Sequence, residues 1–102
     1  MLPRHSNDLL KHLEDVAEYG CTVISRKKLI YWYGQQRLTV TIWRDILEKW
    51  GEILESIPGQ DTKIPLFAAG GNVNDTEVVL VWGEGLSSNG KWLKPISDWA
   101  RA

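Results

Sequence analysis

The chain of 102 residues has a formal net charge of −1, with 43% hydrophobic and 25% charged residues. This length supports one compact core, and the composition lies outside the low-hydrophobicity, high-charge range of disordered chains. The sequence therefore predicts a single domain over residues 1–102. No apolar run approaches the roughly twenty residues that span a bilayer, and the first residues mix charge throughout, so we expect no membrane association and a cytoplasmic protein.

The only cysteine is Cys21, which excludes an internal disulfide and a metal cluster built on several thiolates. A lone cysteine in an apolar stretch predicts a small core residue. His5 and His12 are seven residues apart, but no third ligand stands at a recognisable spacing. We therefore expect neither a metal nor another cofactor.

The first predicted helix covers residues 6–19, where apolar side chains recur at helical spacing. Ser6 or Asn7 would cap its start, which leaves His5 before the helix, and Gly20 would end it. Residues 21–24 are mostly β-branched and too few for a helix, so they predict a short strand.

A second helix is predicted over residues 25–34, with Ser25 as the capping residue and Gly34 as the terminator. The helical projection leaves Lys27, Lys28 and Tyr31 on the side away from the apolar residues. The alternative interpretation makes residues 28–33 a buried strand, because aromatic and β-branched residues favour strands.

The third helix, over residues 39–56, has the widest apolar stripe of the chain, and Thr39 or Thr41 can cap it. Ile46 and Trp50 lie at the centre of this stripe, so we expect them to anchor the core. A short polar turn at residues 35–38 separates this helix from the second one.

Residues 63–69 and 77–82 predict two antiparallel strands joined by a loop at residues 70–76, which is rich in residues that tolerate positive φ. Pro65 has no backbone donor, which predicts either that its strand lies at the edge of the sheet or that this position is oriented outward. A short terminal helix is expected over residues 95–100, with Pro95 in its first turn.

The segment 85–91 has the spacing of a phosphate-binding loop, with Lys91 as its last residue. However, Trp92 stands where such loops carry a magnesium-binding hydroxyl, and Pro95 would interrupt the helix that has to follow. We interpret the segment as a flexible connection. No nucleophile has a base and an acid at a recognisable spacing, so the sequence predicts no enzyme.

Residues 25–44 contain no acidic residue, although the other parts of the chain are acidic or balanced. Such a cluster of cations can recognise a polyanion. Tyr31 is the aromatic residue that the helical projection places beside the cations, where it could stack on a base or anchor a protein partner. The cations are Arg26, Lys27, Lys28, Arg37 and Arg44.

From residue 6 to residue 84, the order helix, strand, helix, turn, helix and hairpin resembles that of the winged helix-turn-helix superfamily. The resemblance implies an α+β, winged-helix-like fold with three helices, a short strand, a C-terminal hairpin and a short terminal helix. It further implies that residues 39–56 enter the major groove of DNA and that the loop 70–76, the wing, touches the DNA backbone.

The resemblance favours a small, non-enzymatic nucleic-acid-binding protein, similar to a transcription regulator and compatible with a homodimer. Side chains at the starts of the second and third helices would contact phosphates or bases. The predicted contact residues are Arg26, Lys27, Lys28, Tyr31, Arg37, Thr39, Thr41 and Arg44.

The charges further along the third helix favour a different function. Its outward positions are predicted to be Asp45, Glu48, Glu52 and Glu55, and the wing carries Asp75 and no cation. Carboxylates repel phosphates, and winged helices also serve as protein docking modules. The alternative expectation is therefore a non-catalytic protein-interaction module, or a small regulator or inhibitor, that binds an acidic protein surface.

Overall fold

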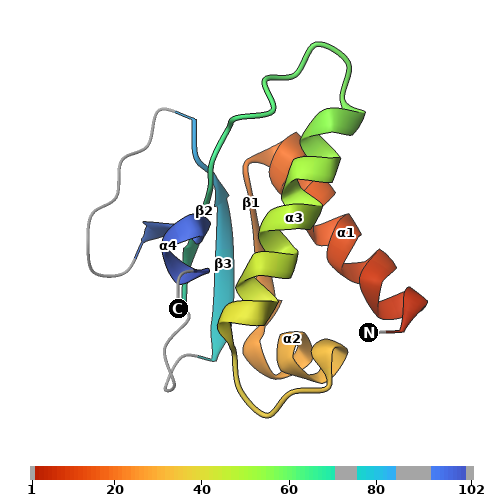
Figure 1. Cartoon of the computed structure of the whole chain (residues 1–102), viewed down its shortest axis with the longest axis vertical. Helices are drawn as coiled ribbons and strands as arrows, with labels where there is room; N and C mark the ends of the chain where they lie inside the picture. Colours follow the sequence, from red (N-terminus) through yellow and green to blue (C-terminus); the bar gives the residue numbers. More distant parts are fainter. Residues whose placement is uncertain (1, 71–75, 85–92, 101–102) are drawn as a thin grey trace.

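The computed structural model describes residues 2–70, 76–84 and 93–100. The described part is an α+β domain in which helices α1, α2 and α3 lie together on one side of a sheet (Figure 1). Helix α4 directly follows β4 and lies near the edge of the sheet that β4 forms. The elements are α1 (Pro3–Tyr19), β1 (Cys21–Ser25), α2 (Arg26–Tyr33), α3 (Val40–Ser56), β2 (Leu66–Ala69), β3 (Glu77–Trp82), β4 (Lys94–Pro95) and α4 (Ile96–Trp99).

The sheet is antiparallel and has the order β1-β3-β2-β4. The predicted hairpin is confirmed as β2 and β3, with Ala68 opposite Leu80. Of the two alternatives for Pro65, the edge position of its strand is wrong, because β2 lies between β3 and β4, whereas the exposure of Pro65 agrees with an outward orientation. Pro65 precedes β2, so its missing donor is not needed in the ladder, and its carbonyl accepts a hydrogen bond from the Gly83 N–H at 2.9 Å.

Helix α1 starts three residues earlier than predicted, with Leu2 as its N-cap. Pro3 suits the first turn, because proline has a helical φ and this position needs no hydrogen-bond donor. His5 therefore lies inside the helix and not before it. Gly20 ends the helix with a φ of 98°, and its N–H donates to the Val16 carbonyl at 2.9 Å.

The second helix is confirmed and the alternative strand at residues 28–33 is wrong. Ser25 caps α2 by accepting a hydrogen bond from the Lys28 N–H at 3.4 Å, and Gly34 ends the helix with a φ of 65°. Thr39 caps α3 in the same way, accepting from the Ile42 N–H at 3.4 Å.

Ile46 and Trp50 are both buried, as predicted, and the Trp50 indole N–H donates to the Ile64 carbonyl at 2.9 Å. One hydrophobic core joins residues from all four helices and the sheet. Helix α4 packs on α3, where Trp43 and Trp99 stack with their ring centroids 5.4 Å apart.

Cys21 is exposed, contrary to the prediction of a core position. In β1 the side chains alternate, and Thr22 and Ile24 point toward the helices, so Cys21 faces the other side of the sheet. No helix in the described part of the chain is long and apolar enough to cross a membrane.

Candidate interaction surface

Three of the predicted contact residues form the exposed face of α2. Lys27, Lys28 and Tyr31 are all exposed, and Tyr31 keeps 65% of its surface accessible, which is unusual for a large aromatic side chain. His5 of α1 lies next to them, with its ring centroid 5.3 Å from that of Tyr31. We call these four residues the basic-aromatic surface.

An open pocket of 420 Å³ lies beside Tyr31, between the start of α1 and the end of α2. Its lining is mainly aromatic and includes His5, Trp32 and Tyr33. The exposed Leu2 side chain borders the same pocket. The basic-aromatic surface therefore offers an aromatic contact area together with two lysines.

The lysines of this surface lie at an electrostatically unfavourable place. They occupy the first turn of α2, which has no acidic residue, although the positive end of a helix dipole favours carboxylates there. The Lys28 Nζ atom lies 5.4 Å from the Trp32 ring centroid, a distance at which a cation is attracted to the ring face.

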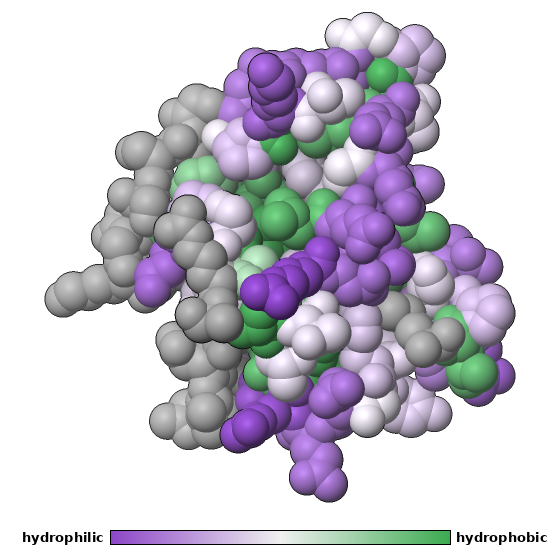
Figure 2. All heavy atoms as spheres, in the orientation of Figure 1, coloured by the Kyte–Doolittle hydropathy of each residue, from purple (hydrophilic) through white to green (hydrophobic). Residues whose placement is uncertain are grey.

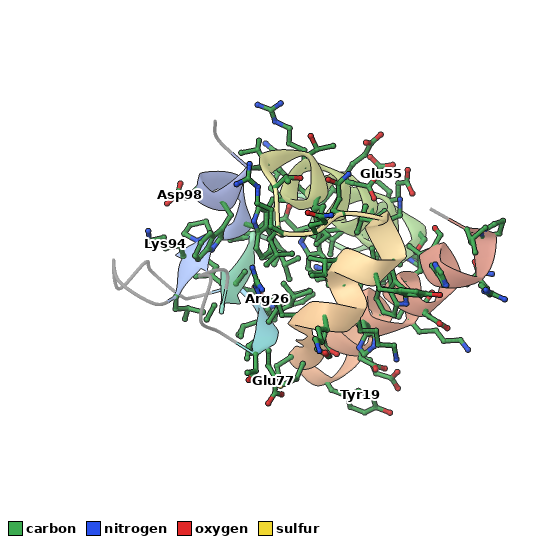
Figure 3. The ribbon with its side chains drawn as sticks, turned by 90° about the horizontal axis from the view of Figure 1, so that it is seen from below. Tyr19, Arg26, Glu55, Glu77, Lys94 and Asp98 are labelled. Carbon is green, nitrogen blue, oxygen red and sulfur yellow. The ribbon has the colours of Figure 1, made fainter. Side chains whose placement is uncertain are left out.

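Arg26 does not belong to the exposed face of α2. Its side chain lies toward the middle of the molecule in Figure 3, and its Nε atom is buried without a partner among the described residues. Its backbone N–H donates to the Thr76 carbonyl at 2.9 Å. The structure thus separates Arg26 from Lys27 and Lys28.

The remaining predicted contact residues lie at the other end of α2 and at the start of α3. Arg37 and Thr41 are exposed, and Arg37 lines an open pocket of 480 Å³ together with Thr39. The Thr39 hydroxyl is engaged as the cap of α3. The Arg44 Nε–H donates to the Ala100 carbonyl at 3.0 Å, which fixes this side chain against α4.

The solvent-facing side of α3 is acidic. Glu48, Glu52 and Glu55 are exposed, and none of them has a salt bridge or hydrogen bond within the described residues. We call these three residues the acidic ridge. Helix α3 also has no basic residue in its last turn, where the helix dipole favours one.

Asp45 does not belong to the acidic ridge, contrary to the sequence prediction. It is partly buried, accepts a hydrogen bond from the Tyr33 hydroxyl at 2.5 Å and forms a salt bridge with Lys49 at 3.1 Å. Burial and the neighbouring Asp45 carboxylate raise the pKa of Tyr33 well above its usual value. The phenol therefore stays protonated and joins α2 to α3.

His12, which the sequence offered only as a weak metal candidate, has a structural role. Its Nδ1 atom shares a hydrogen bond of 2.8 Å with the Thr22 hydroxyl, and its ring lies near that of Trp32. Among residues 2–70, 76–84 and 93–100, no group of three or more potential ligands could hold a metal ion. Most of the predicted wing and the segment 85–91 lie outside the described residues.

Comparisons of the chain with protein-family models, with curated proteins and with solved structures gave no match.

Proposed function

We propose that the protein is a winged-helix-like interaction domain, without catalytic activity, whose basic-aromatic surface binds an acidic surface of a protein partner. Two features of the fold support the winged-helix-like part of this proposal. The order of the elements from α1 to β3 agrees with that architecture, and β2 and β3 form the required hairpin.

The observation that carries the proposal is the acidic ridge on α3. In a DNA-binding winged helix, the third helix enters the major groove, so its solvent-facing side meets the phosphates. Here that side presents Glu48, Glu52 and Glu55, while Arg44 is held by the Ala100 carbonyl. Carboxylates at those positions repel phosphates, and counterion release requires several cations.

The exposed side of α2 has the opposite chemistry. Lys27 and Lys28 attract carboxylates, and Tyr31 provides a large aromatic contact, one of the residue types that contribute most to protein interfaces. Lysines in the first turn of a helix reduce its stability. Their position therefore favours a role in binding over a role in folding.

Nucleic-acid binding remains a second candidate, because Lys27, Lys28 and Arg37 are exposed cations. This candidate predicts affinity for duplex DNA or RNA that falls steeply as salt rises. The proposed function predicts binding to acidic peptides that depends on both Tyr31 and the lysines.

Fluorescence anisotropy distinguishes the two functions. The probes are a labelled peptide that alternates glutamate with leucine, a random duplex DNA and a single-stranded RNA, each titrated with the protein at low salt. We expect the peptide to bind, and the Tyr31→Ala variant and the Lys27→Glu, Lys28→Glu double variant to lose this binding.

The matched control is Lys11→Glu, since Lys11 is also exposed but lies in α1 and lines neither the pocket beside Tyr31 nor the groove beside α3. This variant should keep the affinity of the parent protein for the peptide. Tight, salt-dependent binding to DNA or RNA without binding to the peptide would contradict the proposed function.

A further inference from the structure

An apolar groove lies next to the acidic ridge, between α3, the segment before β2 and the start of α4. It has a volume of 220 Å³ and is lined mainly by Leu47, Trp50, Gly51, Ile64, Pro65 and Ile96. Figure 2 shows hydrophobic residues gathered in this hollow, with hydrophilic residues of α3 along one side of it. The volume is below the roughly 300–1,000 Å³ of sites for drug-sized ligands, so the groove suits a protein side chain.

Gly51 opens the groove on the α3 side. Glycine in the middle of a helix lowers stability relative to alanine, and a Cβ atom placed on Gly51 would meet no atom within 4 Å. Packing within the described part of the chain therefore does not require glycine at this position. A larger side chain would instead reach into the groove, which indicates that the absence of a side chain keeps the groove accessible.

The charges around the groove define what it can bind. Glu48 and Glu52 directly follow the lining residues Leu47 and Gly51 in α3 but do not line the groove themselves. Since successive side chains of a helix point about 100° apart, these exposed carboxylates lie around α3 toward solvent from the groove wall. Lys63 lines it from the loop on the other side. A complementary ligand places an aromatic or aliphatic group in the groove. It also carries cations next to that group, on the part of the ligand that faces α3.

The basic-aromatic surface of this same chain has that chemistry. Tyr31 is an exposed aromatic residue, and Lys27 and Lys28 precede it by one turn of α2, on the same face. The hydroxyl groups of Thr62 and Ser97 in the groove lining can pair with the Tyr31 hydroxyl.

We propose that the apolar groove of one copy binds Tyr31 of a second copy, with Lys27 and Lys28 of that second copy facing Glu48 and Glu52. This inference rests on the proposed function, because it identifies the acidic partner surface as α3 of another molecule. The contact joins two different surfaces, so it is head-to-tail and produces rings or open chains and not a closed two-fold dimer.

Sedimentation velocity and light scattering measure this association directly. We expect the weight-average mass of the parent protein to rise with concentration up to the millimolar range, past that of a dimer, and to fall again at high salt. The variant with both Lys27→Glu and Lys28→Glu should stay monomeric, and so should the variant with both Glu48→Lys and Glu52→Lys.

The decisive sample is an equimolar mixture of these two double variants. The first keeps an intact groove and the second keeps an intact basic-aromatic surface, and the two charge-reversed surfaces are again opposite in charge, so the mixture should associate although neither variant does so alone. Gly51→Leu fills the groove and should also remain monomeric, while Gly51→Ala serves as its matched control. Circular dichroism of each variant checks that the helices are retained.

A parent protein that remains monomeric at millimolar concentration would overturn this inference, as would an association that the variants do not change or a mixture that stays monomeric. If the parent is monomeric but still binds the glutamate–leucine peptide through Tyr31, the proposed function stands and only the self-association fails. If the parent neither self-associates nor binds the peptide, both the proposed function and the self-association fail.

Discussion

The Tyr33 hydroxyl donates a hydrogen bond of 2.5 Å to the Asp45 carboxylate, and this bond connects the end of α2 to the first turns of α3. Lys49 neutralises the same carboxylate one turn further along α3. The hydrogen bond between Tyr33 and Asp45 fixes the position of α2. It thereby also fixes the direction in which the basic-aromatic surface faces.

Tyr33→Phe should lower the free energy of unfolding by about 1.5 kcal/mol. This value is the lower end of the range for hydrogen bonds to charged groups, because Asp45 is still partly exposed to water. Urea denaturation measures it. Tyr31→Phe is the matched control and should leave the midpoint unchanged, since Tyr31 is exposed. Equal midpoints for both variants would contradict the structural role of Tyr33.

Trp50→Ala should destabilise the domain by about 3–5 kcal/mol, a large part of the stability of a small domain. Trp50 is 2% exposed, and its indole donates to the Ile64 carbonyl. Thermal unfolding measures the loss. Trp50→Phe retains much of the volume but not the hydrogen bond, so it should cost less. An alanine variant that melts within a degree or two of the parent would contradict the packing of α3.

The stability of the domain should fall as the pH drops below the unperturbed His12 pKa of 6.5. Burial lowers the pKa of His12 in the folded protein, the positive charge of Lys28 lowers it further, and Asp15 and Asp8 partly oppose this shift. The unfolded chain therefore binds the proton more readily, so this contribution to stability is complete above the unfolded pKa and is lost below it.

The measurement is the melting temperature at a series of pH values from about 8 to about 5.5, above the range where most carboxylates titrate. His12→Gln should show a flatter profile than the parent. A parent profile with no decrease below pH 6.5, or a His12→Gln profile that is equally steep, would show that His12 is not responsible.

Replacing Lys27 and Lys28 with glutamate should stabilise the fold even though it abolishes binding. The carboxylates would face the positive end of the α2 dipole, which contributes about 0.3–1 kcal/mol for each residue at low ionic strength. Loss of the contact between Lys28 and the Trp32 ring, worth roughly 0.5–1 kcal/mol at an exposed site, offsets the gain at position 28, so the net gain comes from position 27. Urea denaturation at low and high salt measures the gain. A double variant that is less stable than the parent would show that the lysines support the fold.

Gly51→Ala should increase the free energy of unfolding by about 0.5–1 kcal/mol, because alanine restricts the unfolded chain and nothing in the described structure obstructs its Cβ atom. Urea denaturation of the parent and of Gly51→Ala measures this difference in the free energy of unfolding. A destabilised variant would show that Gly51 has a packing role and would remove one argument for the groove.

Local signals in the sequence predicted most of the helical structure. Ser25 and Thr39 act as caps, and Gly34 ends α2, because these effects depend on residues close in the chain. The exposure of Tyr31 also follows from helical periodicity. The same periodicity places Glu48, Glu52 and Glu55 on the solvent-facing side of α3.

Long-range contacts account for what the sequence did not predict. Arg44 is exposed as predicted, but its Nε–H donates to the carbonyl of Ala100, 56 residues away, a contact that no local pattern indicates. Asp45 looked solvent-facing, although Tyr33 approaches it from α2. The groove is built from α3, the segment before β2 and α4, so no local pattern could show it.

Nuclear magnetic resonance mapping with the glutamate–leucine peptide tests the central claim most directly, because it identifies the surface that binds. Amide signals of Lys27, Lys28, Tyr31 and His5 should shift as the ¹⁵N-labelled protein is titrated, and Tyr31→Ala should abolish these shifts. Shifts confined to Arg37 and the start of α3, unaffected by Tyr31→Ala, would contradict the account.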